Sequence, residues 1–76
     1  MKYAHITWQD SCGSDEIWDS DPDEIRPVKI ESAGILLREH PDHILLTLSI
    51  DEGPKYDGLL AIPRSAITKM EILTPE

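Results

Sequence analysis

Apolar and polar positions alternate most clearly between residues 28 and 50. Over residues 28–32 the two kinds take turns, which is the period of a half-buried strand. Pro41 and Asp42 then interrupt the pattern, and proline suits the first central position of a type I turn because its ring fixes the backbone. The pattern predicts a hairpin of two long strands. The second strand would place four apolar residues on one face: Ile44, Leu46, Leu48 and Ile50.

Gly34 lies inside the first strand of this hairpin, and the solid apolar block of residues 35–37 follows it. A strand that is apolar on both faces needs cover on both sides. A glycine in a strand interior often marks a bulge or a bend. We therefore predict that Gly34 bends one long ribbon, so that the ribbon serves two sheets.

The flanking segments predict three further strands. Alternation over residues 3–8, 56–62 and 67–73 indicates the first, fourth and fifth strands of a five-stranded domain. Residues 63–66 are too few for an α-helix and suit a single 3₁₀ turn before the last strand. The chain would then form one all-β domain over residues 1–76.

Residues 10–27 are predicted to form a long acidic loop between the first two strands. They contain seven of the 15 acidic residues, and most of the formal net charge of −8 comes from this patch. Ser14 can cap one helical turn over residues 14–18, and Trp18 is expected to anchor the loop on the domain. Because proteins bind nucleic-acid backbones with Lys and Arg, this charge disfavours nucleic acid and favours a basic partner surface.

Composition adds three exclusions. A chain of 76 residues with a single cysteine cannot form an internal disulfide, which fits a reducing compartment. No segment approaches the roughly 20 apolar residues that span a bilayer. The N-terminus lacks the apolar core of a signal peptide. We expect a soluble protein of the cytoplasm that does not contact a membrane.

Motifs that could hold a metal are incomplete. The run 19–23 has the Asp spacing that opens a calcium loop, but Glu24 and Ile30 stand where that loop needs Gly and Glu. A solvated acidic loop explains the run better. His40 and His43 flank the hairpin turn, where exposed histidines are usual. The spacing does not bring them together with His5 and Cys12 as the four converging ligands that zinc requires.

Catalytic groups are not indicated. Cys12 lies among acidic residues, which raise rather than lower the pKa of a thiol, so an ordinary free thiol is the better interpretation. No pair of acids lies in an apolar setting that would separate two pKa values for acid–base work. We predict a protein that is not an enzyme, with no catalytic residue, cofactor or metal.

Five residues are candidates for contact with a partner or ligand. Trp8 and Trp18 are explained better as core and loop anchors than as stacking platforms. Arg64 leaves two interpretations open. It either caps the turn or pairs with an acid, or it is the cation for an anionic ligand. The candidates are Trp8, Asp10, Trp18, Tyr56 and Arg64.

A surplus of apolar residues lies opposite the face assigned to the core. Soluble monomers seldom expose a large apolar patch, and an open five-stranded sheet also has two unpaired edges. Pairing of the fourth strand of one copy with the fifth strand of the next would satisfy both. We therefore expect a homo-oligomer whose interface includes Leu45, Leu59, Ala61 and Ile67.

The order of elements resembles SH3-like barrels, and more closely the Sm-like proteins, over residues 28–73. Gly34 and the run 61–68 carry this resemblance. It implies an all-β fold, a small, strongly bent five-stranded barrel. The acidic loop between the first two strands departs from the Sm pattern, because it replaces most of an N-terminal helix. The resemblance also implies ring assembly and RNA binding, although Arg64 is the only basic residue near the turn where RNA contacts are expected.

Residues 8–11, 32–34 and 62–67 together look like short uncharacterised proteins of phages and prophages. This resemblance says nothing of activity, but together with the acidic patch and the lack of catalytic groupings it favours a phage-type binding protein in a bacterial host. It would act on a host protein or a small anionic ligand, and a counter-defence role would fit. The alternatives are an Sm-like RNA-binding ring and a structural component of virion assembly.

Overall fold

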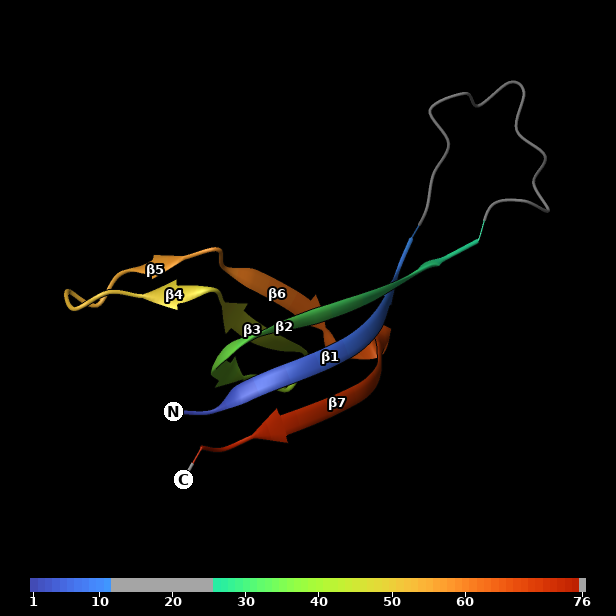
Figure 1. Ribbon diagram of the computed structural model, residues 1–76. Helices are drawn as coiled ribbons and strands as arrows, with labels where there is room; N and C mark the ends of the chain where they lie inside the picture. The colour runs from blue at the N-terminus through green and yellow to red at the C-terminus, as the bar shows by residue number, and fades with distance from the viewer. Residues whose placement is uncertain (12–25, 76) are drawn as a thin grey trace, which may run out of the picture.

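The computed structural model describes residues 1–11 and 26–75, and these form an all-β domain (Figure 1). The predicted helical turn over residues 14–18 and the anchoring role of Trp18 lie outside the described residues. Within them, one 3₁₀ turn, η2 (Arg64–Ala66), accompanies seven strands. The strands are β1 (Tyr3–Asp10), β2 (Val28–Glu39), β3 (His43–Thr47), β4 (Ser49–Ile50), β5 (Tyr56–Asp57), β6 (Leu60–Pro63) and β7 (Ile67–Leu73).

Five of the strands form one antiparallel sheet in the order β6-β3-β2-β1-β7, while β4 and β5 form a separate two-stranded arm (Figure 1). The five-stranded all-β prediction is confirmed. The predicted closure into a barrel is wrong, because β6 and β7 lie at opposite ends of the strand order. β6 has four residues and ends in Pro63, which has no backbone N–H to donate, so it offers a poor edge for closing the sheet.

β2 is the long ribbon that the sequence predicted. Its first part, 28–35, pairs with β1, and its last part, 35–39, pairs with β3. A Cβ added at Gly34 would lie 2.9 Å from the carbonyl oxygen of Thr47, so glycine permits the close approach of β3. The register irregularity falls between Leu36 and Arg38 rather than at Gly34 itself.

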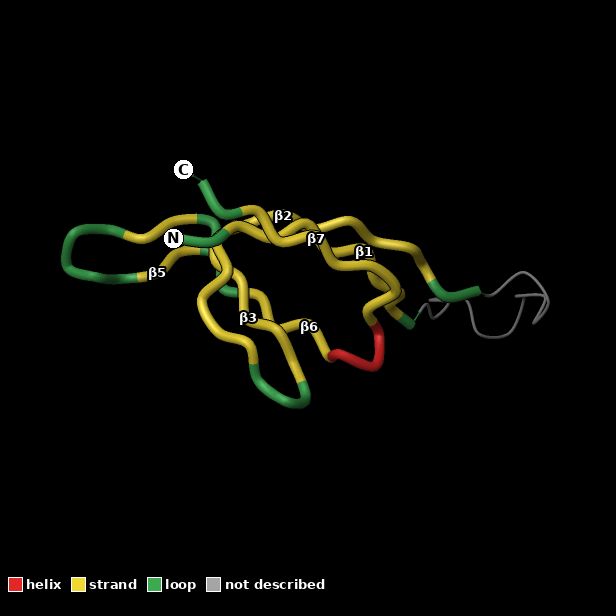
Figure 2. Tube along the Cα trace, turned by 90° about the horizontal axis from the view of Figure 1, so that it is seen from below, coloured by secondary structure: helices red, strands yellow, loops and turns green. Residues whose placement is uncertain are grey.

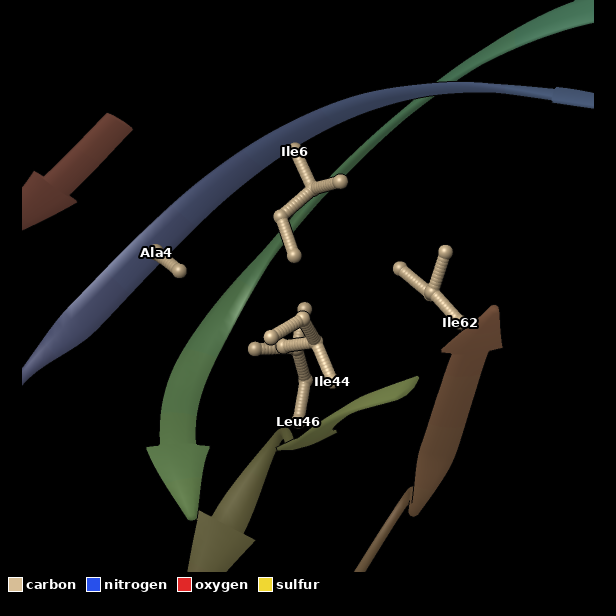
Figure 3. Close-up of a cluster of buried hydrophobic side chains, with 5 residues drawn as sticks. All are labelled: Ala4, Ile6, Ile44, Leu46 and Ile62. Atoms are coloured by element: carbon tan, nitrogen blue, oxygen red, sulfur yellow. The ribbon is translucent and has the colours of Figure 1, made fainter. Parts of the chain in front are cut away.

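The core is a small cluster between the two halves of the folded sheet (Figure 3). β1 contributes two of its members, β3 contributes two and β6 contributes one, and in the close-up their side chains point toward one another. Trp8, Leu36, Ile67 and Met70 pack against this cluster while remaining partly exposed. The cluster is Ala4, Ile6, Ile44, Leu46 and Ile62.

The predicted second hairpin strand ends early. Leu46 and Thr47 are both buried, which breaks the alternation, and Leu48 is 69% exposed instead of lying in the core. The hydroxyl of Thr47 explains the break, because it donates to the carbonyl oxygen of Asp57 at 2.7 Å and lies 3.2 Å from that of Ser49. The chain therefore leaves the main sheet at Thr47 and enters the arm.

The predicted fourth strand is also interrupted, and it becomes β5 and β6. Gly58 separates them with a φ of +70°, a backbone conformation that L side chains rarely adopt. A Cβ at this position would lie 2.7 Å from Leu48 Cδ1, so space is restricted as well. Glycine is thus required at position 58, where the segment between β5 and β6 packs against Leu48.

The remaining elements match their predictions. The turn around Pro41 and Asp42 joins β2 to β3, and the backbone N–H of His40 donates to the carbonyl oxygen of His43 at 2.9 Å. η2 and β7 occupy the predicted positions, and Figure 2 shows η2 in red carrying the chain from β6 to the other half of the sheet. None of the described residues belongs to a helix long and apolar enough to cross a membrane.

Candidate functional site

Arg64 connects η2 to the turn between β2 and β3. Its Nε–H donates to the carbonyl oxygen of His40 at 2.6 Å, and its backbone N–H donates to that of Asp42 at 2.9 Å. The side chain of Arg64 therefore holds the turn between β2 and β3 and does not cap η2, which has no side-chain cap, and it pairs with no acid among the described residues. The other interpretation, a cation for an anionic ligand, stays a prediction. A guanidinium carries five N–H donors, so the hydrogen bond to His40 leaves donors on its terminal nitrogens.

Two histidines lie beside Arg64 at this turn. The rings of His40 and His43 stack with their centroids 4.5 Å apart, and Nδ1 of His43 lies 2.6 Å from a carboxylate oxygen of Asp42. That hydrogen bond is the main reason why the pKa of Asp42 is below its ordinary value. Because Asp42 is then ionised at neutral pH, Nδ1 of His43 acts as the donor. This end of the sheet gathers donors that suit an anion.

Metal ligands do not converge in residues 1–11 and 26–75, where no group of three His, Cys, Asp or Glu side chains could hold an ion. His5 lies on β1 and its Nε2 is 3.6 Å from a carboxylate oxygen of Glu31, far along the chain from the histidines of the turn. Cys12 and the Asp run 19–23 lie outside the described residues.

An apolar hollow of about 200 Å³ lies on the face of β2 and β3 that is opposite the core. Tyr56, which the sequence nominated as a ligand contact, shares it with two predicted interface residues, Leu45 and Leu59. Ala61 pairs with Leu45 across β3 and β6, so three of the four predicted interface residues lie together. The full lining is Leu37, Arg38, Leu45, Tyr56 and Leu59.

The other nominated residues are not part of this hollow. Ile67 packs against the core cluster at the start of β7. Trp8 also packs against the core, and its indole N–H donates to the hydroxyl oxygen of Ser32 at 3.1 Å, as expected of a core anchor. Asp10 ends β1, and its carboxylate accepts a hydrogen bond from the backbone N–H of Ser11 at 2.9 Å. Trp18 lies outside the described residues, and of the nominated ligand contacts within them the structure brings Tyr56 alone into the hollow.

A second hollow of about 320 Å³ lies where the arm leaves the sheet. Part of its lining consists of small residues, namely Ser32, Ala33 and Gly58. Leu59 lines both this hollow and the first one. This second hollow was not predicted from the sequence, because the predicted strands ran unbroken through Leu48 and Gly58. Gly58 was the available signal, since an isolated glycine in a strand pattern often marks a break. The lining is Ser32, Ala33, Leu46, Thr47, Leu48, Gly58, Leu59 and Leu60.

Comparison of the chain with models of protein families, with curated proteins and with solved structures finds no match in any of the three.

Proposed function

We propose that this chain is a small non-enzymatic binding protein of phage or prophage type that works in the cytoplasm of a bacterial host. It assembles with copies of itself and captures a host protein or a small anionic ligand. The observation that carries the proposal is the apolar surface around Leu45, Tyr56 and Leu59, where Tyr56 and Leu59 are 45% and 56% exposed. A solvated sheet face normally carries polar side chains at such positions, and gathered apolar residues often mark a contact surface.

Assembly is supported by the two unpaired edges of the main sheet. β6 and β7 each have one free side, and large apolar residues are exposed on both strands or beside them. Leu59 and Leu60 are 56% and 37% exposed at the start of β6, while Ile72 and Leu73 are 39% and 61% exposed at the end of β7. Antiparallel pairing of β6 with β7 of a second copy would bring these two ends together and bury both pairs.

The finer fold assignment rests on the same strands. The order β6-β3-β2-β1-β7, with a 3₁₀ turn between the two edge strands, is the arrangement that the SH3-like and Sm-like resemblance implies. We assign the domain to that group as an open, strongly bent member. In such a member, edge pairing between copies replaces closure of the barrel within one chain.

Light scattering at micromolar concentration tests assembly. We expect a mass of several chains for the natural sequence and a mass closer to one chain for Leu73→Asp, because a carboxylate would then lie at the edge contact. Leu48→Asp is the matched control, since Leu48 is similarly exposed but belongs to neither edge strand. The mass of a single chain for the natural sequence would refute the assembly proposal.

An Sm-like RNA-binding ring is the second candidate. It is favoured by the remaining guanidinium donors of Arg64 beside the stacked rings of His40 and His43, and it is opposed by the Asp42 carboxylate at the same place and by the net charge of −8. Binding of labelled single-stranded RNA across a range of salt concentrations separates the two. Tight binding that weakens steeply with salt would favour the ring, because such binding depends on phosphate contacts. Absence of binding at low salt would favour the first candidate.

A further inference from the structure

A bulge in β2 places two consecutive side chains around one hollow. Leu36 faces Leu46 and Arg38 faces Leu45, so β2 advances by two residues while β3 advances by one. In a regular strand, Leu37 and Arg38 would point to opposite faces. A bulge redirects one of them, and both line the same hollow of about 200 Å³. Bulges of this kind often redirect a side chain beside a functional site.

The hollow has the composition of a site for a small molecule. Its walls are the side chains of Leu37, Leu45 and Leu59 with the ring of Tyr56, and Arg38 is the charged residue among the described residues that line it. Ligand sites are typically apolar with a few well-placed polar groups. The volume corresponds to roughly seven water molecules, which suits a small ligand or one apolar side chain.

The guanidinium of Arg38 is held at the rim. Its Nη1–H donates to the carbonyl oxygen of Leu37 at 2.8 Å, which uses one of the five donors of the group. No carboxylate pairs with Arg38 within residues 1–11 and 26–75. Arg38 shares the absence of an ion pair with most Lys and Arg residues of the described chain, and what distinguishes it is its place in the lining of an apolar hollow. The remaining guanidinium donors suit the two oxygens of a carboxylate.

We propose that this hollow binds a small carboxylic acid with an apolar body. The apolar body lies among the three leucines and Tyr56, and the carboxylate accepts hydrogen bonds from Arg38. A phosphate is excluded as the preferred ligand because a single cation serves a dianion poorly and the walls offer no further charge. The inference rests on the proposed capture of a small anionic ligand and names the class of that ligand. Because Leu45 and Leu59 also belong to the proposed interface between copies, the test measures acid binding and particle mass on the same samples.

The test uses 3-phenylpropanoate as the probe and follows the chemical shifts of Leu45, Tyr56 and Leu59 by NMR. For so small a ligand we expect a dissociation constant in the millimolar range. Its alcohol analogue, 3-phenylpropan-1-ol, keeps the apolar body and removes the charge. It should bind about fivefold more weakly, as expected for loss of one charge-assisted pair at a partly exposed site.

The variant is Arg38→Gln, and Lys55→Gln is its control because it removes the same charge from the exposed arm. Arg38→Gln should weaken binding of the acid about fivefold and leave binding of the alcohol unchanged, whereas Lys55→Gln should match the natural chain. Equal binding of acid and alcohol, an unchanged Arg38→Gln variant, or no shift at the lining residues would overturn the proposal.

Light scattering on the same samples keeps this result apart from the assembly proposal. Arg38 belongs to β2, which is paired on both sides, so Arg38→Gln should leave the mass of the particle unchanged. Acid binding by a particle of single-chain mass would support the hollow and refute assembly. Loss of acid binding by Arg38→Gln together with an unchanged oligomer mass would support both.

Discussion

The outer face of the sheet has two halves that differ in chemistry. On β2, β1 and β7 it carries polar and charged side chains, with His5 Nε2 3.6 Å from a carboxylate oxygen of Glu31 and an ion pair in which Lys69 Nζ lies 2.9 Å from a carboxylate oxygen of Glu71. On β3 and β6, and at the neighbouring Tyr56, it carries leucines around a hollow and one arginine. Both halves lie over the same core. The first half carries charged side chains along its strands, with exposed apolar residues at its ends, and the second half carries an apolar hollow.

The difference shows why an apolar face should be read together with its neighbours. A sheet that is half solvated normally alternates apolar residues inside and polar residues outside. β1 follows this rule, while Leu37, Leu45 and Leu59 break it within one region. Scattered exposed leucines need no explanation, whereas leucines gathered around one hollow are the observation on which the binding proposal rests.

The largest expected effect contrasts the two faces of β3 in the apolar half. Ile44→Ala should lower the free energy of unfolding by about 3 kcal/mol, because Ile44 is fully buried and its removal leaves a cavity. Its neighbour Leu45 faces the hollow, and Leu45→Ala should cost less than about 1.5 kcal/mol. Urea denaturation measures both, and Ile44→Val, at about 1 kcal/mol, covers the case in which the alanine variant does not fold. Equal costs at the two positions would remove the distinction between core and contact face.

Substitution of Gly58 tests the break between β5 and β6, which lies beside the apolar half of the outer face. Gly58→Ala should destabilise the fold by about 1–3 kcal/mol, because alanine is strained at a φ of +70° and its Cβ meets Leu48. Gly53→Ala on the same arm is the control, since its φ is not positive and only a side-chain oxygen of Asp51 is close. Thermal unfolding of the two variants gives the comparison, and similar midpoints would contradict the strain at Gly58.

Substitution of Arg64 tests the side-chain hydrogen bond that joins the turn to η2. Arg64→Met keeps much of the apolar stem and removes the Nε–H bond to His40, so we expect a loss below about 1 kcal/mol. Arg64→Lys keeps the positive charge but has no planar fork, and should lose nearly as much. A lysine variant as stable as the natural chain would show that charge rather than hydrogen-bond geometry holds the turn.

The smallest effect is expected in the polar half. The Lys69 ammonium lowers the pKa of Glu71, first through a hydrogen bond to it and then through its charge. A carboxyl whose pKa is lower in the folded chain stabilises the fold above its unfolded pKa, and this contribution disappears as the pH falls through the folded pKa. Glu71→Gln should therefore cost little at neutral pH, since both groups are exposed, and should match the natural chain in acid. A large loss at neutral pH would place this pair among the main stabilising contacts.

Sequence pattern predicted the elements whose residues follow a regular period. Apolar and polar residues alternate over 3–8 and 67–73, and both segments are strands. The second has the predicted bounds, and the first begins at Tyr3 as predicted but continues to Asp10. The turn at Pro41 and the 3₁₀ turn within residues 63–66 were predicted from their own residues, since the proline ring of each restricts the backbone. Local preference and tertiary structure agree in these elements, so the prediction needs no knowledge of the neighbouring strands.

The misses lie where a contact between distant residues decides the outcome. The burial of Thr47 and the exposure of Leu48 depend on a hydrogen bond to Asp57, ten residues further on. The placement of Arg38 beside Leu37 depends on a bulge whose register involves β3, and the alternation of β2 gave no sign of it. Tyr56 was nominated from the sequence, but the hollow that it lines could only be found once the arm and the sheet were placed.

The three residues of η2 connect β6 directly to β7, which are the two edge strands of the main sheet in the described chain, so a short elbow of chain joins the two edges. Both backbone and side chain of Arg64 brace that elbow against the hairpin turn, which leaves little freedom for one edge to swing relative to the other. In any chain of copies joined edge to edge, the angle from each copy to the next would be set at this point. Its curvature, and whether it closes on itself, would depend on the bend of the five-stranded sheet and on this short connection between its edges.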